Sequence, residues 1–129
     1  MITEGINSLK EVANFKALVR KRETAITEPK LKDYSLLRDI LSIVKDECLN
    51  LNIQDYKPYY VAIVAYLYSP RVYMGEAFNY GVRPELAKTL GITGQGITYY
   101  MVNVRNWITI YKSFSDNVEY LCNKVIERL

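Results

Sequence analysis

The sequence predicts an all-α fold, a compact helical domain of about six or seven helices with a helix-turn-helix unit. Apolar residues recur at helical spacing in two long segments, only residues 59–68 are a candidate strand, and proline or glycine stands where most of the helices begin or end. A chain of 129 residues suffices for one domain whose core needs no metal or disulfide. We divide it into an N-terminal helical arm and connector at 1–34 and a helical domain at 35–129.

The N-terminal arm contains the start signal of a helix. Ser8 and Glu11 have the Ser-x-x-Glu spacing of a capping box, in which two side chains satisfy free amides of the first helical turn. A helix over about 9–22 is therefore expected. Residues 23–34 lack a clear period and contain Pro29, which indicates a connector.

The segment after Ser35 is predicted to be an amphipathic helix, because its apolar residues recur every three or four positions. Cys48 lies in this stripe and Cys122 lies among other apolar residues. Neither has a CxxC partner, so we expect two free core thiols. The predicted core face comprises Leu36, Leu37, Ile40, Leu41, Val44, Cys48 and Leu49, and the predicted solvated face comprises Arg38, Asp39, Ser42, Lys45 and Asp46.

Residues 59–68 are apolar on every side, so their period does not separate a buried helix from a buried strand. Pro58 at a first helical position and two alanines favour a central helix. Pro70 then starts a short helix that runs to about Asn79 and is stopped by Gly81.

Two helices joined by a glycine-containing turn follow. The first covers 84–90 and ends at Gly91, and the second covers about 94–112 with Thr93 as its N-cap. This order of short helix, tight turn and second helix is that of a helix-turn-helix unit, here at 84–112. At about 100° per residue, the second helix buries Ile97, Met101, Val104, Ile108 and Tyr111, with Tyr100 and Trp107 at the edge of this face.

The opposite face of the second helix is the candidate DNA-reading surface. In a major groove its N-terminal side chains meet base edges, where glutamine pairs with adenine and threonine contacts thymine. The base-facing candidates are Thr93, Gln95, Thr98 and Tyr99, and the candidate phosphate contacts are Arg71, Arg83, Lys88, Arg105 and Lys112. Residues 70–112 hold these five cations against two glutamates, so we expect salt-sensitive binding to double-stranded DNA.

The helix at 84–91, its turn, the long helix and a closing helix over 113–129 together form a pattern that resembles the C-terminal DNA-binding domain of the bacterial replication initiator DnaA. The turn of that family carries an Arg-Asp-His-Thr/Ser-Thr run, whereas residues 92–96 here are Ile-Thr-Gly-Gln-Gly. The resemblance therefore implies the scaffold and not the initiator's own DNA target. It places Gln95, Gly96 and Thr98 toward the groove.

The amino-acid composition excludes several classes of enzyme and metal site. The chain has no histidine, which excludes Ser-His-Asp and Cys-His catalysis and histidine-containing zinc sites. Carboxylate, lysine or tyrosine chemistry remains possible, but we expect a protein that is not an enzyme and that uses no cofactor or metal. No signal-like N-terminus and no apolar run of about 20 residues is present, which predicts a cytoplasmic protein without a membrane segment. The net charge of +3 permits a nucleic-acid partner.

Several alternatives use the same residues. Nine of the 12 tyrosines lie between 56 and 100, which suits either an ordinary core or a surface for a homo-oligomer or protein partner, as in a structural, adaptor or virion-associated protein. A packed helix pair that binds nothing also fits. Gly91 and Gly94 have the GxxG spacing of a KH domain, which needs three strands. We favour non-enzymatic DNA binding that regulates replication or transcription of a phage or mobile element.

Overall fold

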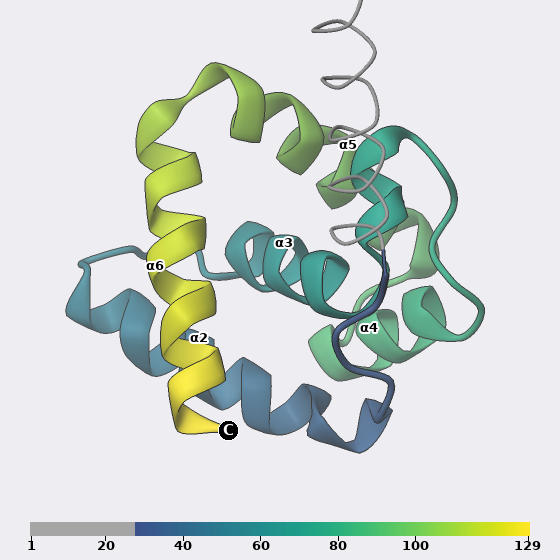
Figure 1. The fold of residues 1–129 in the computed structure, drawn as a ribbon, viewed down its shortest axis with the longest axis horizontal. Helices are drawn as coiled ribbons and strands as arrows, with labels where there is room; N and C mark the ends of the chain where they lie inside the picture. The colour runs from purple at the N-terminus through teal and green to yellow at the C-terminus, as the bar shows by residue number, and fades with distance from the viewer. Residues whose placement is uncertain (1–27) are drawn as a thin grey trace, which may run out of the picture.

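The computed structural model describes residues 28–129 of the chain, and helix α3, Lys57–Tyr68, lies at their centre (Figure 1). Nine of the 12 residues of α3 are buried, because the segment is apolar on every side. Pro58 lies in the first turn, where the amide that proline lacks has no helical partner to lose. The prediction of a central helix rather than a strand is confirmed.

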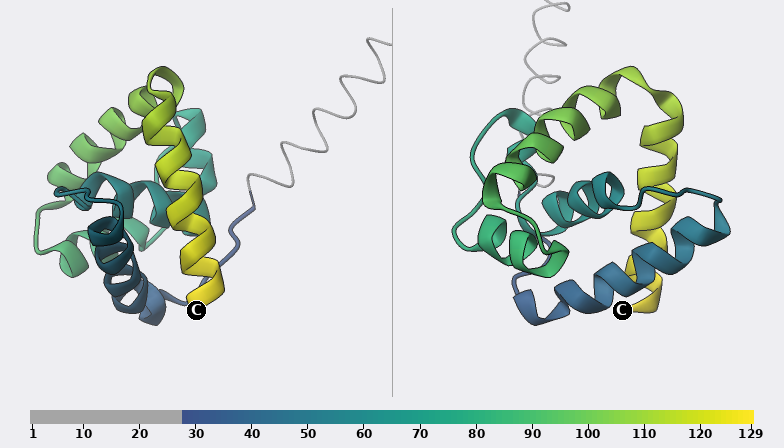
Figure 2. Two further views of the ribbon diagram at one scale, coloured as in Figure 1. Left: turned by 90° about the vertical axis from the view of Figure 1, so that its left-hand side faces the viewer. Right: turned by 180° about the vertical axis from the view of Figure 1, so that it is seen from behind.

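Four further helices surround α3. They are α2 (Leu37–Asn50), α4 (Val82–Leu90), α5 (Gly94–Ile110) and α6 (Lys112–Arg128). Figure 1 shows them placed around α3, and the view from behind in Figure 2 shows the same arrangement. Residues 28–129 are thus all-α, with five α-helices, two short 3-10 helices and no strand, and the predicted six or seven helices are not reached in this part of the chain. The arm helix expected at 9–22 lies outside the described residues.

None of the helices in residues 28–129 is both long enough and apolar enough to cross a membrane. The most apolar of them is α3, and it has only 12 residues. Its apolar surface is covered by the other helices of the same domain.

Helix α2 follows directly from a 3-10 turn, η1 (Tyr34–Leu36). The predicted solvated face is exposed throughout, but the predicted core face is wrong at Leu49, which is 76% exposed. Ile43 and Glu47 are buried instead, because α2 packs against α6 as well as against α3 and α4. The fully confirmed core positions of this helix are Leu37, Ile40, Val44 and Cys48.

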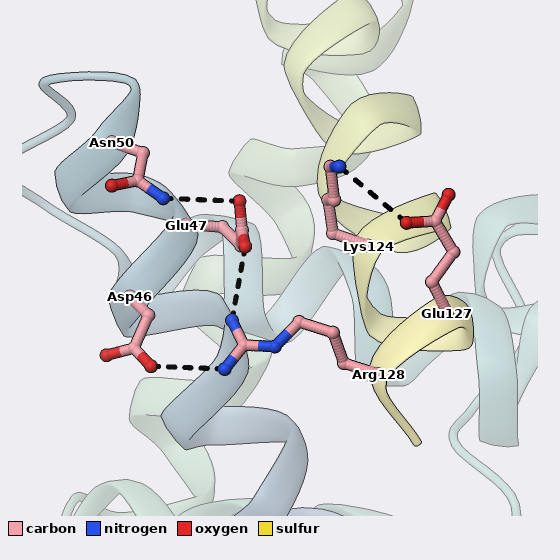
Figure 3. Close-up of polar contacts among 6 residues, drawn as sticks. All are labelled: Asp46, Glu47, Asn50, Lys124, Glu127 and Arg128. Carbon is pink, nitrogen blue, oxygen red and sulfur yellow. Dashed lines mark hydrogen bonds and ion pairs between the residues drawn. The ribbon is translucent and has the colours of Figure 1, made fainter.

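A polar contact joins the C-terminal end of α6 to α2 (Figure 3). Arg128 donates to Glu47 Oε2 over 3.1 Å and to Asp46 Oδ2 over 3.3 Å. The Glu47 side chain is only 10% exposed, and the side-chain amide of Asn50 is its second donor at 3.5 Å. The guanidinium therefore balances a carboxylate that would otherwise be buried without a counter-charge.

The C-terminal end of α3 is buried, and neighbouring segments satisfy its free carbonyls. The amides of Lys30 and Leu31 both donate to the Leu67 carbonyl oxygen, over 2.8 and 3.0 Å. The side-chain amide of Asn79 donates to the Tyr68 carbonyl oxygen over 2.9 Å. These bonds attach the connector before α2 and the segment before α4 to the same helix end.

The helix predicted after α3 is shorter than expected. It is a 3-10 helix, η2 (Pro70–Met74), that ends at Gly75 with φ 88° and does not continue to Asn79. Asn79 is held outside any helix because its backbone amide donates to Ser69 Oγ while its side chain binds the end of α3. Gly81 does not stop this helix; it has φ 87° and directly precedes α4.

Helices α5 and α6 meet at a sharp bend, visible in Figure 2. The predicted helix to residue 112 ends at Ile110, because Tyr111 has an extended backbone with φ −107° and ψ 107°. Tyr111 was expected in the buried face and is 55% exposed. Trp107 and Phe114, on either side of the bend, pack edge to face with ring centroids 5.6 Å apart, and this contact holds the two helices together.

Candidate nucleic-acid interface

Helices α4 and α5 are joined by a turn of three residues, Gly91 to Thr93. Gly91 ends α4 with φ 69°, a left-handed conformation that glycine adopts without steric cost. Thr93 caps α5, since its hydroxyl oxygen accepts a hydrogen bond from the Gly96 amide over 3.0 Å. The predicted ends of both helices at this turn are confirmed.

The predicted base-facing residues all lie on the surface. Helix α5 is anchored by Ile97, Met101 and Val104, which are buried as predicted. Its opposite side is open to solvent, and Tyr99 there is 68% exposed. The exposed base-facing candidates are Thr93, Gln95, Thr98 and Tyr99.

Arg83 lies across the start of α5. Its guanidinium donates to Thr98 Oγ1 over 3.1 Å, and Thr98 Oγ1 donates in turn to the Gly94 carbonyl oxygen over 3.2 Å. A Cβ atom on Gly94 would lie 3.0 Å from Arg83 Nε, so the absence of a side chain there leaves room for the guanidinium. The structure thus places a predicted phosphate contact beside a predicted base-facing residue, and it engages the Thr98 hydroxyl twice.

Two more of the predicted phosphate contacts have partners within the domain. Arg105 donates to the Val72 carbonyl oxygen over 3.1 Å and so ties α5 to η2. Arg71 forms an ion pair with Glu76, with 3.3 Å between the charged atoms. These two arginines therefore have less freedom to reach a partner than the sequence suggested.

The remaining predicted phosphate contacts are exposed but are not gathered in one place. Lys88 lies in the last turn of α4, next to the turn into α5. Lys112 begins α6, roughly 20 Å along the axis of α5 from Thr98. Arg83 and Lys88, both on α4, are therefore the cations that adjoin the N-terminal half of α5.

A hollow of about 760 Å³ opens next to Arg83, between α4, α5 and the irregular segment 76–81. Phe78 and Met101 give it apolar walls, and Arg83 and Thr98 lie on its lining. Sequence reasoning missed this hollow, because part of the segment that forms one side of it was predicted to be helical. No local pattern in the sequence indicates it.

Most tyrosines of the region 56–100 belong to the core. Seven of the nine are buried or packed against it, and only Tyr80 and Tyr99 are exposed. The hydroxyls of Tyr60, Tyr68 and Tyr73 each donate to a backbone carbonyl oxygen. Burial raises the pKa of Tyr68 to about 12 and raises the pKa values of Tyr60 and Tyr73 further. These hydroxyls are structural donors that stay protonated near neutral pH.

Sequence reasoning missed two exposed apolar residues of α5, Val102 and Ile110. Val102 is 43% exposed, and at about 140° from Ile97 its angular position could have placed it on the solvent side. With it, the outer face of α5 is defined as Gln95, Thr98, Tyr99, Val102 and Asn106, all exposed.

Comparison of the chain with protein-family models, with curated proteins and with solved structures finds no match in any of the three. The resemblance of residues 84–129 to the DnaA domain is carried by helix spacing and apolar pattern alone. Function is therefore inferred from the geometry of α4 and α5 and from the chemistry of their exposed side chains.

Proposed function

We propose that this chain is a non-enzymatic DNA-binding protein in which α4 and α5 form a helix-turn-helix unit and α5 enters the major groove of duplex DNA. One observation carries the proposal. The N-terminal turns of α5 expose uncharged hydrogen-bonding side chains, Gln95, Thr98 and Tyr99, on a helix whose other face is buried. A surface helix of this kind meets base edges with its first turns when it lies in a major groove.

The cations of α4 supply the backbone contacts. Phosphate contacts fix the register of a protein on the duplex, and base contacts then read the sequence. Arg83 lies beside Thr98, and Lys88 lies next to the turn, so both flank the base-facing side chains. The hydrogen bond from Arg83 to Thr98 orients the guanidinium before DNA arrives, which lowers the entropy lost on binding.

We propose the biological setting by analogy with other small DNA-binding proteins. A small DNA-binding protein with a scaffold that resembles the DnaA domain suits the regulation of replication or transcription of a phage or mobile element. The alternative, an oligomeric or adaptor protein that uses its tyrosines, has less support because only Tyr80 and Tyr99 of the nine tyrosines at 56–100 are exposed.

Fluorescence anisotropy tests the proposal. A labelled random-sequence duplex, a single-stranded DNA and an RNA are each titrated with the protein at two salt concentrations. We expect the duplex to bind most tightly, with an affinity that falls as salt rises. Preference for RNA or single strands, or no binding at low salt, overturns the proposal, and a defined oligomer in light scattering without DNA affinity favours the adaptor alternative.

A pair of charge-matched variants localises the binding surface. Lys88→Ala and Lys124→Ala each remove one positive charge, but Lys124 lies on α6, on the far side of α3 from α4 (Figure 1). We expect Lys88→Ala to weaken binding and to reduce the salt slope by about 0.9. Lys124→Ala should leave both unchanged, and equal effects of the two variants would show that binding is not centred on α4 and α5.

A further inference from the structure

The outer face of α5 carries no charged side chain along the part that would enter the groove. From Gly94 to Val104 the helix contains no Lys, Arg, Asp or Glu. The first charged residue is Arg105, whose guanidinium donates one hydrogen bond to the Val72 carbonyl oxygen. The nearest cation from another element, Arg83, is bonded to Thr98.

Because the outer face has no charged side chain, it can recognise some base pairs better than others. In the major groove, guanine offers two acceptors that arginine or lysine reads best, and cytosine offers a donor that a carboxylate accepts. Neither kind of side chain is present on the outer face. Adenine offers one acceptor and one donor, which a glutamine amide such as that of Gln95 matches with two hydrogen bonds.

The apolar side chains of the outer face indicate contact with thymine, the base that pairs with adenine. Thymine alone presents a methyl group in the major groove, and apolar side chains recognise it by contact. Val102 is 43% exposed and Tyr99 is 68% exposed, so both offer apolar surface on this face. The Thr98 hydroxyl already accepts a hydrogen bond from Arg83 and donates one to the Gly94 carbonyl oxygen, so it has only one acceptor position left for a base.

We infer that the duplex bound by α5 is rich in A·T pairs, which the outer face of α5 recognises through adenine edges and thymine methyl groups. This inference rests on the proposed function, since it names the sequence class that the same helix reads. Val102 and Gln95 are then residues that determine specificity.

Selection from a pool tests the sequence class. The full chain is incubated with duplexes randomised over 14 base pairs, a length of about one and a third helical turns, and bound molecules are sequenced after several rounds. We expect an enriched site dominated by A·T pairs that binds at least tenfold more tightly than a site with those pairs replaced by G·C. An enriched site dominated by G·C pairs, or equal affinity for both, overturns the inference.

Uracil substitution tests the methyl contact. Deoxyuridine keeps the hydrogen-bonding groups of thymidine but lacks its methyl group, so replacing thymines of the selected site one at a time should weaken binding severalfold at one or two positions. In Val102→Ala the penalty at one of these positions should disappear, because the contact is already absent. Ile110→Ala, an exposed apolar residue near the C-terminal end of the same helix, should retain the full penalty.

The possible outcomes distinguish a failure of this inference from a failure of the proposed DNA-binding function. A protein that binds duplex DNA without enriching any sequence keeps the proposed function and loses the inference. An A·T preference with no penalty for uracil anywhere shows readout by groove shape, and it overturns recognition through thymine methyl groups. If the chain binds no duplex in the pool, both the inference and the proposed function are wrong.

Discussion

Arg83 Nη1 and Thr98 Oγ1 lie 3.1 Å apart, so a side-chain hydrogen bond joins the first turn of α4 to the second turn of α5. The guanidinium lies over Gly94, where a Cβ atom would approach Arg83 Nε to 3.0 Å. The position of Arg83, a proposed phosphate contact, relative to α5, the helix proposed to read bases, is therefore set within the protein itself.

Removal of this guanidinium should affect binding more than stability. In Arg83→Ala we expect DNA affinity to fall about tenfold at low salt and the salt slope to decrease by about 0.9. The free energy of unfolding should change by less than about 1 kcal/mol, because the lost hydrogen bond is exposed. Urea unfolding followed by circular dichroism, together with anisotropy, checks both effects. A large loss of stability with unchanged affinity would assign Arg83 a purely structural role.

Substitution of Gly91, in the turn between α4 and α5, should affect stability more than DNA binding. Gly91 has φ 69°, and no atom lies within 4 Å of the position that a Cβ atom would take there, so Gly91→Ala meets backbone strain without a steric clash. We expect a loss of about 1 kcal/mol of stability and little direct effect on the surface proposed to bind DNA. Gly91→Asn should lose less, since asparagine tolerates the left-handed region. Equal losses for the two variants, measured by urea unfolding, would contradict this explanation.

The contact between α2 and α6 predicts a larger loss of stability. Arg128→Ala leaves Glu47, with a side chain only 10% exposed, without its guanidinium partner. We expect destabilisation by about 2 kcal/mol, below the cost of a fully buried pair because Arg128 itself is 42% exposed. The double variant Glu47→Gln/Arg128→Ala should recover part of the loss. Lys124→Ala, which breaks an exposed pair with Glu127, should cost less than about 0.5 kcal/mol.

The two thiols should resist labelling in the native protein. Burial, with a smaller contribution from the charge of Asp55, raises the pKa of Cys48 to about 11, and burial raises the pKa of Cys122. Because the thiolate is the reactive form, a disulfide reagent at pH 8 should label neither residue on the timescale at which it labels the unfolded chain. Urea should expose both together. Rapid native labelling of one thiol would show that its part of the core opens locally.

Stability should fall in alkaline solution. The pKa values of Cys48 and Tyr68 are raised by burial to about 11 and about 12, so the native state holds their protons more tightly than the unfolded state. Their contribution is complete below the unfolded pKa values, near 8.5 for cysteine and 10 for tyrosine, and is lost as pH rises through the native values. Urea unfolding at several pH values between 7 and 11 measures the decline. In Cys48→Ala the part of the decline that starts near pH 9 should be reduced.

Local signals in the sequence were enough for the elements that carry the candidate site. Gly91 and Thr93 define the turn because positive φ and N-capping depend on single residues and their nearest neighbours. The apolar period of α5 likewise identified its buried and exposed faces. The same period predicts the outer face of α5, which has no charged residue, and the angular position of Val102 belongs to it.

Departures from the predictions occur where distant segments meet. Leu49 is exposed and Glu47 is buried because α6 covers one side of α2, and the period of α2 alone does not show which side that is. Asn79 leaves the expected helix because its side chain binds the end of α3. Tyr111 leaves the core because the chain turns there so that Trp107 and Phe114 pack together.

The sequence by itself determined the all-α class, the central helix, the turn at Gly91 and the surface position of Gln95, Thr98 and Tyr99, since each follows from local backbone preference or helical period. Only the tertiary structure decided which cations stay available for a partner. It engages Arg105 with Val72 and sets Arg83 beside Thr98. The physical reason is that a long charged side chain reaches across several residues, so its partner depends on which elements pack next to it and not on its neighbours in the chain.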